Sequence, residues 1–389
     1  MSAEDTVTMF ENVKRICHDN RGCKGLEFAT NVSDLVIEEV GDGNLNDVIR
    51  ILSPSFNGRN SAVAKRGPPY IKCLGPEYPL TINRNKVEYD ALLKFDSIIP
   101  GCVPKPLYRS PDENIYFMED LKGYELLRRL LIKGINCEEA ILKLAQNIAQ
   151  VHKETHVSKL SQEEKTELTE DFKNEEMVAL TKNFVFTAPF VNGEPTNQCA
   201  DNVRPLLPQI YDAPNVLQAS ERMRILFLEK KECLVHGDLH TGSVMCTSDG
   251  KDPKMMDIEF AFFGPCAFDV GMFLANLIFT FYQHMSTQQD NDTHRQYAYG
   301  IVNLGKQFVA VYMKQMTCIS GSIENFISEV TGFCGCELIR RTIGVAHVED
   351  FKDSEFGEQE ALGAGIRLLQ AVDRIETVDK LMVIALMLV

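Results

Sequence analysis

The stretch "LVHGDLHTGSVMCT" (234–247) places two histidines, an aspartate and several hydroxyl side chains between apolar residues. A buried strand or a core helix would not select these residues, which points to a chemical role for Asp238. A second acidic pair, Asp257 and Glu259, follows in "PKMMDIEFAFFGP" (253–265). A carboxylate held in place can accept a proton from a hydroxyl group, and Mg²⁺ prefers carboxylate oxygens as ligands. The alternative is that these acids lie on surface loops.

The order of these acids is similar to that in protein kinases, where a catalytic-loop aspartate precedes a metal-binding aspartate. On this comparison Asp238 orients the attacking hydroxyl and accepts its proton, and Asp257 holds Mg²⁺ against the phosphates. Ser243 stands where a kinase has its metal-binding asparagine, and a serine is a weaker ligand. In an extended segment Glu259 would share a face with Asp257, so we expect Glu259 to supply the missing coordination.

A glycine-containing loop lies upstream, in "EVGDGNLN", between two strand-like runs. Gly41 and Gly43 would let backbone N–H groups approach phosphate oxygens, and Asn44 or Asn46 could add a side-chain donor. Many hairpins carry Gly-x-Gly only as turn residues, so this motif is weak when taken alone.

Two further residues resemble the kinase arrangement. Lys65 ends the strand-like "AVAK", as the kinase strand lysine does, and Glu88 follows on a predicted helix where it could pair with Lys65. The alternatives are an exposed lysine and a glutamate on the solvent face of the helix.

The segment "FMEDL" (117–121) lies where a β-rich region gives way to a helical one. We expect backbone groups of Glu119, Asp120 and Leu121 to contact an adenine ring there, although a plain linker would have the same composition. Asp269 begins a long apolar helix and could support the catalytic loop. Helix capping would explain Asp269 equally well.

The elements that position these residues follow from local patterning. The stretch 34–53 reads as a hairpin, 61–67 as a third strand, 81–95 as a helix and 114–123 as a further strand. After Lys122 the pattern becomes helical and stays mostly so to the end. We therefore predict an α+β fold with two lobes. A small β-rich, nucleotide-binding lobe covers 1–118, and a larger, mainly α-helical catalytic lobe covers 119–389.

Composition sets outer limits. A chain of 389 residues exceeds one hydrophobic core, which favours two domains. The net charge of −15 argues against a broad nucleic-acid-binding surface. The 12 cysteines form no CxxC pair, as expected of reduced thiols in a cytoplasmic protein. "MSAEDTVTMF" lacks a signal-peptide pattern. The apolar part of 270–289 is about 15 residues, which predicts a buried core helix and no membrane span.

Five segments carry a family resemblance: "HGDLHTGSVM", "DIEFAFFGPCAFDVG", "EVGDGNLN", "YPLTINR" and "IRRTIGVAHVED". Together they resemble the methylthioribose kinases, a family of the aminoglycoside phosphotransferase and choline kinase superfamily with a protein-kinase-like fold. The resemblance covers about residues 34 to 352. It implies MgATP-dependent phosphorylation of 5-methylthio-D-ribose at its anomeric hydroxyl, giving the 1-phosphate, in methionine salvage. Bacterial members are typically homodimers.

Carried over residue by residue, the resemblance makes Asp238 the catalytic aspartate and Asp257 and Glu259 the metal ligands. It places Arg340 and Arg341 at the sugar substrate. The ATP contacts it implies are Gly41, Gly43, Asn44 or Asn46, Lys65, Glu119, Asp120, Leu121, Asp257, Ile258 and Glu259.

The chain departs from the family pattern in three places. Ile258 stands where the family usually has proline between its two acids, and both carboxylates remain. Tyr78 replaces a tryptophan before "PLT", and the chain has no tryptophan at all. The connection between Asp238 and Asp257 is slightly longer than in bacterial members. The tyrosine could change affinity or specificity.

The twin arginines also have a physical rationale. They lie in the largely apolar "CGCELIRRTIGVAHVED", where charged side chains need a reason. Forked guanidinium donors suit both sugar hydroxyls and a transferring phosphoryl group. Adjacent helical residues point about 100° apart, so one arginine could instead form a structural ion pair. Two other classes stay open: a related kinase acting on choline, homoserine or an aminoglycoside, and a pseudokinase-like binding protein.

Overall fold

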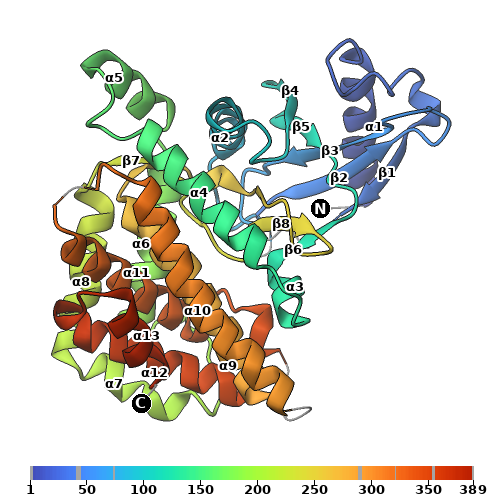
Figure 1. Cartoon of the computed structure of the whole chain (residues 1–389). Coiled ribbons are helices and arrows are strands. Elements are labelled where there is room, and N and C mark those ends of the chain that lie inside the picture. The colour runs from blue at the N-terminus through green and yellow to red at the C-terminus, as the bar shows by residue number, and fades with distance from the viewer. Residues whose placement is uncertain are drawn as a thin grey trace. The chain divides into compact units, whose positions relative to one another are not determined.

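The chain forms two compact units, Met1–Gly123 and Tyr124–Val389. The computed structural model describes residues 3–40, 45–72, 75–287, 291–319, 321–352 and 355–387. The sequence-based division after residue 118 lies close to this boundary. The fold class is the predicted one, with a small antiparallel sheet in the first unit and a mainly helical second unit (Figure 1).

Unit 1 is built around one five-stranded antiparallel sheet with the strand order β1-β2-β3-β5-β4. Its β1–β2 hairpin and its third strand are those expected from the sequence. Its elements are α1 (Ala3–Asp19), the 3-10 turn Val32–Asp34, β1 (Val36–Glu39), β2 (Asp47–Leu52), β3 (Ser61–Arg66), α2 (Arg84–Ile98), β4 (Pro106–Ser110) and β5 (Ile115–Glu119).

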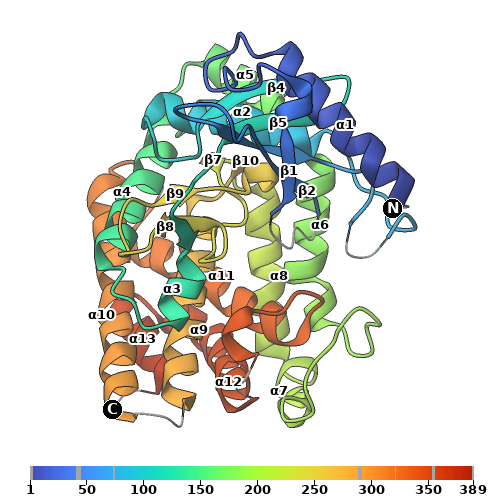
Figure 2. The ribbon, with the colours of Figure 1, turned by 90° about the vertical axis from the view of Figure 1, so that its right-hand side faces the viewer.

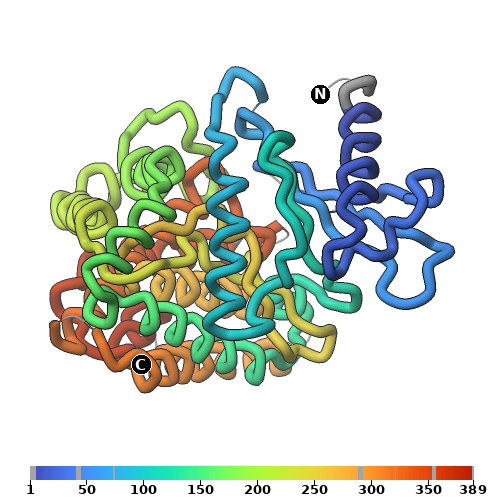
Figure 3. Tube along the Cα trace, turned by 90° about the horizontal axis from the view of Figure 1, so that it is seen from above, coloured from blue at the N-terminus to red at the C-terminus, as the bar shows by residue number. Residues whose placement is uncertain are grey.

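Helix α1, the dark blue coil near the N-terminus in Figure 3, supplies part of the core of unit 1. Met9, Val13 and Ile16 recur at helical spacing and pack in one cluster with Ile49 of β2 and Phe117 of β5. The first 30 residues showed no readable pattern in the sequence. Only the structure identifies this helix, because it shows the apolar residues of the helix buried in the core of unit 1.

Strand β3 is the central strand of this sheet, and it is buried at five of its six positions. Ala62 and Ala64 belong to the core cluster that includes α1. Side chains alternate along a strand, so Lys65 points to the opposite face, where Glu88 of α2 meets it. The strand therefore directs a lysine toward α2 while its alanines pack toward α1.

Unit 2 is mostly helical and carries two small sheets, β7 with β10 and β6-β8-β9. Its helices are α3 (Leu127–Ile132), α4 (Glu138–Glu154), α5 (Gln162–Asp171), α6 (Glu175–Phe186), α7 (Pro208–Tyr211), α8 (Pro214–Glu229), α9 (Cys266–Ser286), α10 (Asn291–Gln315), α11 (Ile323–Ile343), α12 (Glu355–Ala371) and α13 (Val378–Leu386). Its strands are β6 (Tyr124–Leu126), β7 (Cys233–Val235), β8 (Val244–Thr247), β9 (Lys254–Met255) and β10 (Phe262–Gly264). Short 3-10 turns cover Ala188–Phe190, Arg204–Leu206, Ile258–Phe260, Glu349–Phe351 and Val372–Arg374.

Helix α9 is the central helix of unit 2 and packs against α10, α11 and α12 (Figure 2). Among the described residues it alone is long and apolar enough to cross a membrane, and 94% of its most apolar window is buried within the protein. The sequence-based interpretation of 270–289 as a core helix is confirmed for Val270–Ser286, and residues 288 and 289 lie outside the described residues. The buried helix supports the loop that carries Asp238.

The small sheets place the two acidic motifs. Strand β7 ends at Val235, immediately before the His236–Asp238 segment, and β8 begins at Val244. Strand β9 ends two residues before Asp257, and β10 returns to pair with β7. Both motifs thus lie on short loops whose ends are held in ladders, which limits how far their carboxylates can move.

Candidate active site

The loop leading to Asp238 is anchored by the first turn of α9. Asp269 accepts hydrogen bonds from the backbone N–H groups of His236, at 2.7 Å, and Gly237, at 3.0 Å. The Asp269 carboxylate is fully buried and also contacts Nε2 of His152 at 3.1 Å. Gly237 adopts a φ of +84°, and a Cβ there would collide with the carbonyl oxygen of Phe260. These contacts fix the peptide immediately before Asp238.

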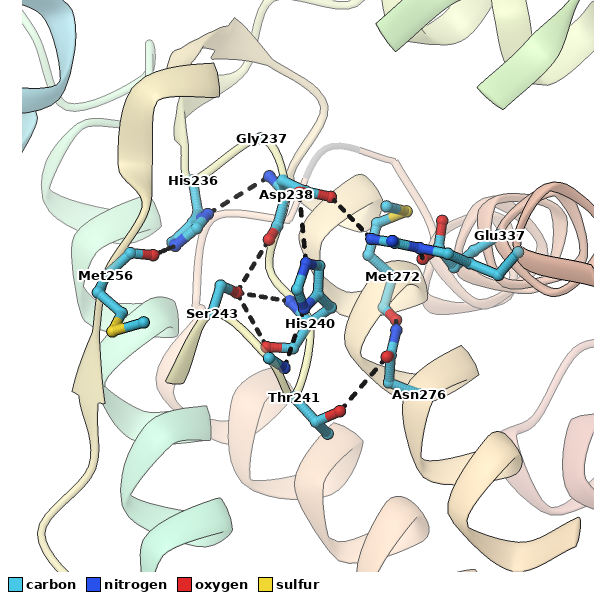
Figure 4. A network of polar contacts seen from close by, with 12 residues as sticks. His236, Gly237, Asp238, His240, Thr241, Ser243, Met256, Met272, Asn276 and Glu337 are labelled. Atoms are coloured by element: carbon cyan, nitrogen blue, oxygen red, sulfur yellow. Dashed lines mark hydrogen bonds and ion pairs between the residues drawn. The ribbon is translucent and has the colours of Figure 1, made fainter. Parts of the chain in front are cut away.

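Three basic side chains approach the carboxylate of Asp238. Figure 4 shows one of them, His240, beside it. Oδ1 accepts a hydrogen bond from a guanidinium nitrogen of Arg340 at 3.1 Å, and Arg341 lies 3.7 Å from the same oxygen. Oδ2 lies 3.4 Å from Nε2 of His240. Burial acts to raise the pKa of Asp238, but His240 and the two arginines outweigh it and hold that pKa well below the usual value. The side chain keeps 25% exposure, so the ionised carboxylate remains open on one side.

Both arginines reach Asp238 because Glu337 holds them from one helical turn earlier on α11. The Nε groups of Arg340 and Arg341 donate to the two oxygens of Glu337, at 2.5 and 3.0 Å. Adjacent helical residues would otherwise diverge, as the sequence-based alternative supposed. Glu337 is fully buried, and the two cations overcome the effect of burial and lower its pKa. Sequence reasoning missed this glutamate, although its spacing of three and four residues from the arginines was a usable signal.

The hydroxyl of Ser243 is hydrogen-bonded within its own loop, which is not expected of a metal ligand. Its hydroxyl accepts from the backbone N–H of His240 at 2.9 Å and lies 2.9 Å from the carbonyl oxygens of Asp238 and His240. The residue is only 1% exposed. The hydroxyl closes the catalytic loop on itself, so Ser243 acts as a support for that loop.

The acidic pair is not extended, and the expectation that alternation along a strand places both carboxylates on one face is wrong. Asp257 has φ 59° and ψ 45°, in the left-handed region, and the 3-10 turn Ile258–Phe260 follows. Aspartate tolerates this region because its short side chain can hydrogen-bond locally. Asn174 donates to the carbonyl oxygens of Glu259 and Ala261, at 2.8 and 3.0 Å, and holds the turn.

The chemistry of Asp257 and Glu259 suits a magnesium ion that phosphates help to hold. Within the described parts of the chain, no group of three or more histidine, cysteine or acidic side chains could hold a metal ion by itself. Mg²⁺ commonly uses one or two carboxylates together with substrate phosphates. The side chain of Ile258 is fully buried, so only its backbone could contact a nucleotide.

In unit 1, Lys65 and Glu88 form a buried ion pair with 2.6 Å between Nζ and Oε1. Each residue is 2% exposed. The alternatives of an exposed lysine and of a glutamate on the solvent face of the helix are therefore wrong. Glu88 fixes the direction of the Lys65 ammonium group, which a phosphate-binding lysine requires.

The expected phosphate loop falls largely outside the described residues: Gly41, Gly43 and Asn44 lie there. Asn46 is described and 5% exposed, and its Oδ1 accepts from Nε of Arg84 at 3.2 Å. Arg84 is fully buried and also donates to the carbonyl oxygens of Leu45, at 3.1 Å, and Pro68, at 2.7 Å. Sequence reasoning quoted this arginine in "YPLTINR" but did not assign it a role, which is to anchor the end of the loop.

The segment 119–121 uses its acidic side chains within unit 1. Asp120 receives Nε of Arg50 at 3.0 Å and the hydroxyl of Ser61 at 2.7 Å. Glu119 pairs with Arg59. The backbone N–H of Glu119 donates to Lys105. The side chains of both acids therefore serve the fold, which leaves backbone groups for any contact with an adenine ring.

The family described as "Phosphotransferase enzyme family" matches residues 37–300 of the chain. The methylthioribose kinase of Bacillus velezensis is 32% identical over 330 residues, which cover 82% of this chain and 81% of that protein. The methylthioribose kinase of Geobacillus kaustophilus is 32% identical over 348 residues, with 86% and 87% coverage. The chain belongs to the methylthioribose kinase family.

Methylthioribose kinases are small-molecule kinases, and the chain is an enzyme of that type. A solved choline kinase from Cryptosporidium parvum Iowa II superposes with a TM-score of 0.53 at 15% identity, covering 96% of this chain and 98% of that one. This likeness shows the fold alone. It agrees with the protein-kinase-like fold expected from the sequence.

Arg128 and Asp350 also join the site of this member of the methylthioribose kinase family, and sequence reasoning gave a role to neither. Nε of Arg128 lies 3.2 Å from the Thr241 hydroxyl and 3.3 Å from Oδ2 of Asp350. Its NH2 group donates to Asn276 at 2.6 Å. Asp350 is 5% exposed, and burial raises its pKa against the opposing effect of Arg128. Asp350 ends the quoted "VAHVED", but no sequence pattern marked Arg128.

The tyrosine that departs from the methylthioribose kinase pattern is on the surface of unit 1. Tyr78 is 47% exposed, and its carbonyl oxygen accepts from the backbone N–H of Ile71 at 2.9 Å. An exposed aromatic side chain remains available to a ligand.

Proposed function

We propose that this kinase transfers the γ-phosphoryl group of ATP to the anomeric hydroxyl of 5-methylthio-D-ribose. The product is 5-methylthioribose 1-phosphate, and the reaction belongs to methionine salvage. The observation that carries the proposal is the convergence of Arg340 and Arg341 on the Asp238 carboxylate. This arrangement combines a proton acceptor with forked donors for hydroxyl and phosphoryl oxygens.

Asp238 acts on the sugar hydroxyl. Its lowered pKa keeps the carboxylate ionised, and its partly exposed side can receive the hydroxyl proton. A weak base suffices because phosphoryl transfer has a loose transition state, in which the hydroxyl proton leaves late. An anomeric hydroxyl is also more acidic than an ordinary alcohol. The chief contribution of Asp238 is therefore to orient the nucleophile.

Arg340 and Arg341 act on the sugar and on the transferring group. A sugar is neutral and rich in hydroxyls, and guanidinium groups donate hydrogen bonds to such oxygens in a fixed geometry. Once Asp238 takes up a proton, the positive charge near it is less compensated, which favours the phosphoryl oxygens. Glu337 keeps both guanidinium groups oriented throughout.

Unit 1 supplies the groups that we assign to the nucleotide. Lys65 would contact phosphate oxygens, and the backbone of the loop at 41–44 would donate to them. Backbone groups at Leu121 are the preferred adenine contact, because Glu119 N–H and Asp120 C=O already have backbone partners. Asp257 and Glu259 would hold Mg²⁺, which neutralises charge on the phosphates.

We propose a cytoplasmic location and a homodimer on the family resemblance, and no nucleic-acid or membrane partner. The net charge of −15 supports the absence of a nucleic-acid partner. Analytical ultracentrifugation at several concentrations would test the dimer, and a single species near 43.8 kDa would contradict it.

The alternative acceptors are choline, homoserine and aminoglycosides. Choline and aminoglycosides are cationic and call for an acidic pocket. An acceptor at Asp238 would meet the guanidinium groups of Arg340 and Arg341 beside that carboxylate. Two cations directed at the catalytic carboxylate disfavour a cationic acceptor.

ADP release with a panel of acceptors tests the proposal. We expect efficient turnover of 5-methylthioribose and weaker turnover of ribose, since an apolar group of methylthio size contributes about 1–3 kcal/mol. Choline, homoserine and kanamycin should not react. NMR of the product should place the phosphate on the anomeric carbon. Turnover of choline or kanamycin without turnover of methylthioribose would overturn the assignment.

A further inference from the structure

The His240 ring lies beside Asp238 (Figure 4), and its own loop contacts the ring nitrogen Nδ1. The backbone N–H of Gly242 donates to Nδ1 of His240 at 2.9 Å. A ring nitrogen that accepts a hydrogen bond carries no hydrogen, so the hydrogen of a neutral ring is on Nε2. A Cβ at Gly242 would lie 3.0 Å from Nδ1, so a larger residue would displace the ring.

The backbone of His240 is also fixed. Its N–H donates to the Ser243 hydroxyl at 2.9 Å, and its carbonyl oxygen lies 2.9 Å from the same hydroxyl. The side chain is 14% exposed. The ring therefore has little freedom to turn away, and Nε2 stays directed at Oδ2 of Asp238, 3.4 Å away.

The two oxygens of Asp238 thus have different neighbours. Oδ1 receives a charged donor, Arg340, at 3.1 Å. Oδ2 faces the Nε2–H of His240. Contacts at both oxygens limit the rotation of the carboxylate about its terminal bond. Arg341 also approaches Oδ1, which leaves the second lone pair of Oδ2 for a substrate hydroxyl.

We propose that His240 is a positioning residue, a neutral donor that holds Oδ2 of Asp238 and so sets the plane of the catalytic carboxylate. This inference rests on the proposed role of Asp238 as the group that orients the acceptor hydroxyl. It assigns no contact between His240 and either the nucleotide or the sugar.

The neutrality of this donor has a physical purpose. Burial lowers the pKa of His240 to about 4, although Asp238 attracts a proton to it, and the cations Arg341 and Arg128 act with burial. Arg340 and Arg341 already weaken Asp238 as a proton acceptor. A third cation would weaken it further, whereas a neutral N–H orients the carboxylate with little loss of basicity.

Two substitutions separate orientation from loop structure. The side-chain amide of H240Q can reach the place of Nε2 and donate to Asp238. In H240N the shorter amide can accept the Gly242 N–H in place of Nδ1 but cannot reach Asp238. With 5-methylthioribose as acceptor, we expect H240Q to keep at least about a third of wild-type kcat. H240N should lose about 10- to 100-fold, the range expected for a misplaced catalytic group.

The KM for ATP should stay within about twofold of the wild-type value in both variants, and thermal unfolding should show both folded. Equal kcat values for the two variants would overturn the proposal. An effect confined to the KM for ATP would also overturn it, because that result would indicate a nucleotide contact.

A second measurement needs no substrate. Long-range ¹H–¹⁵N spectra of histidine-labelled protein at pH 7, with the His240 signals assigned from their loss in H240Q, report the tautomer. We expect a neutral ring with its hydrogen on Nε2, and a doubly protonated ring or an Nδ1–H tautomer would overturn the inference. Failure of the wild type to phosphorylate methylthioribose would instead count against the proposed function alone, because these spectra do not depend on the acceptor.

Discussion

Glu337 and Arg341 lie one helical turn apart on α11, and Oε1 of Glu337 accepts a hydrogen bond from Nε of Arg341 at 3.0 Å. The other oxygen of the same carboxylate receives Nε of Arg340. One buried acid therefore orients two neighbouring guanidinium groups, and their outer nitrogens are left for Asp238.

The E337Q substitution should disrupt this arrangement. The glutamine amide offers one acceptor and one donor group, so one arginine Nε would face a donor. We expect kcat/KM to fall at least about tenfold, and the free energy of unfolding to fall by about 3–5 kcal/mol because two buried cations lose their counter-ion. Steady-state kinetics and urea unfolding measure the two effects. E329Q, on the same helix, is the matched control, and equal behaviour of the two variants would contradict the role of Glu337.

The R340K and R341K substitutions should lower kcat/KM, because a lysine cannot donate to Glu337 and Asp238 at once with a fixed fork. We expect about a tenfold or greater loss in R340K. A smaller loss is expected in R341K, since Arg341 lies 3.7 Å from Oδ1 of Asp238 and Arg340 lies 3.1 Å away. R222K, on the exposed side of α8, serves as the control. The reverse ranking would show that proximity to Asp238 does not set their importance.

The D238N substitution should leave the fold and MgATP binding intact while turnover falls by about 10²–10⁴, the usual contribution of a general base. Asparagine has the size of aspartate, but its NH2 group replaces one acceptor oxygen, so it neither takes up the proton nor orients the hydroxyl in the same way. Product formation, ATP binding by calorimetry and thermal unfolding should be compared with D201N, which changes an exposed aspartate of the same unit. Retention of more than about a tenth of wild-type turnover would remove Asp238 from its assigned role.

The metal assignments predict separate effects for the two acids. D257N should nearly abolish activity, because we assign to Asp257 the role of the principal magnesium ligand of kinases. E259Q should raise the Mg²⁺ concentration needed for half-maximal rate. Ser243 is engaged in its own loop, and E259Q removes the carboxylate that we propose as the ligand in its place. Mg²⁺ titrations at fixed ATP measure this. An unchanged titration curve for E259Q would refute the proposed compensation.

The pH dependence of stability follows from His240. Its folded-state pKa is lowered to about 4, below the unfolded value, so the unfolded chain binds a proton as pH falls through about 6.5 while the folded protein does not. Stability is therefore lost between pH 7 and 5, by about 2 kcal/mol at pH 5 from this group. Urea unfolding at both pH values should show a decline smaller by that amount in H240Q. Parallel declines in the two proteins would contradict the lowered pKa.

The sequence predicted most of the local structure that positions the site. Alternation and turn residues identified β1, β2 and β3, and the helix expected over 81–95 is α2, whose Val87 and Leu92 are buried. These patterns are readable because each element buries one face against a single core. The sequence analysis did not predict helix α1, because the apolar positions of this helix lie among charged residues. The expected extended geometry after Asp257 failed because a left-handed residue reverses the chain there.

By itself the sequence determined the two-part α+β organisation, the acidic motifs and the family, since residue types and short spacings carry that information. Only the tertiary structure decided that His240 and Arg340 lie at opposite oxygens of Asp238, that Glu337 pairs with both arginines, and that Arg128 pairs with Asp350. Arg340 and Asp238 are separated by 102 residues. Such contacts are set by how α9, α11 and the short sheets pack, because local periodicity records only which face of an element is buried and not what that face meets.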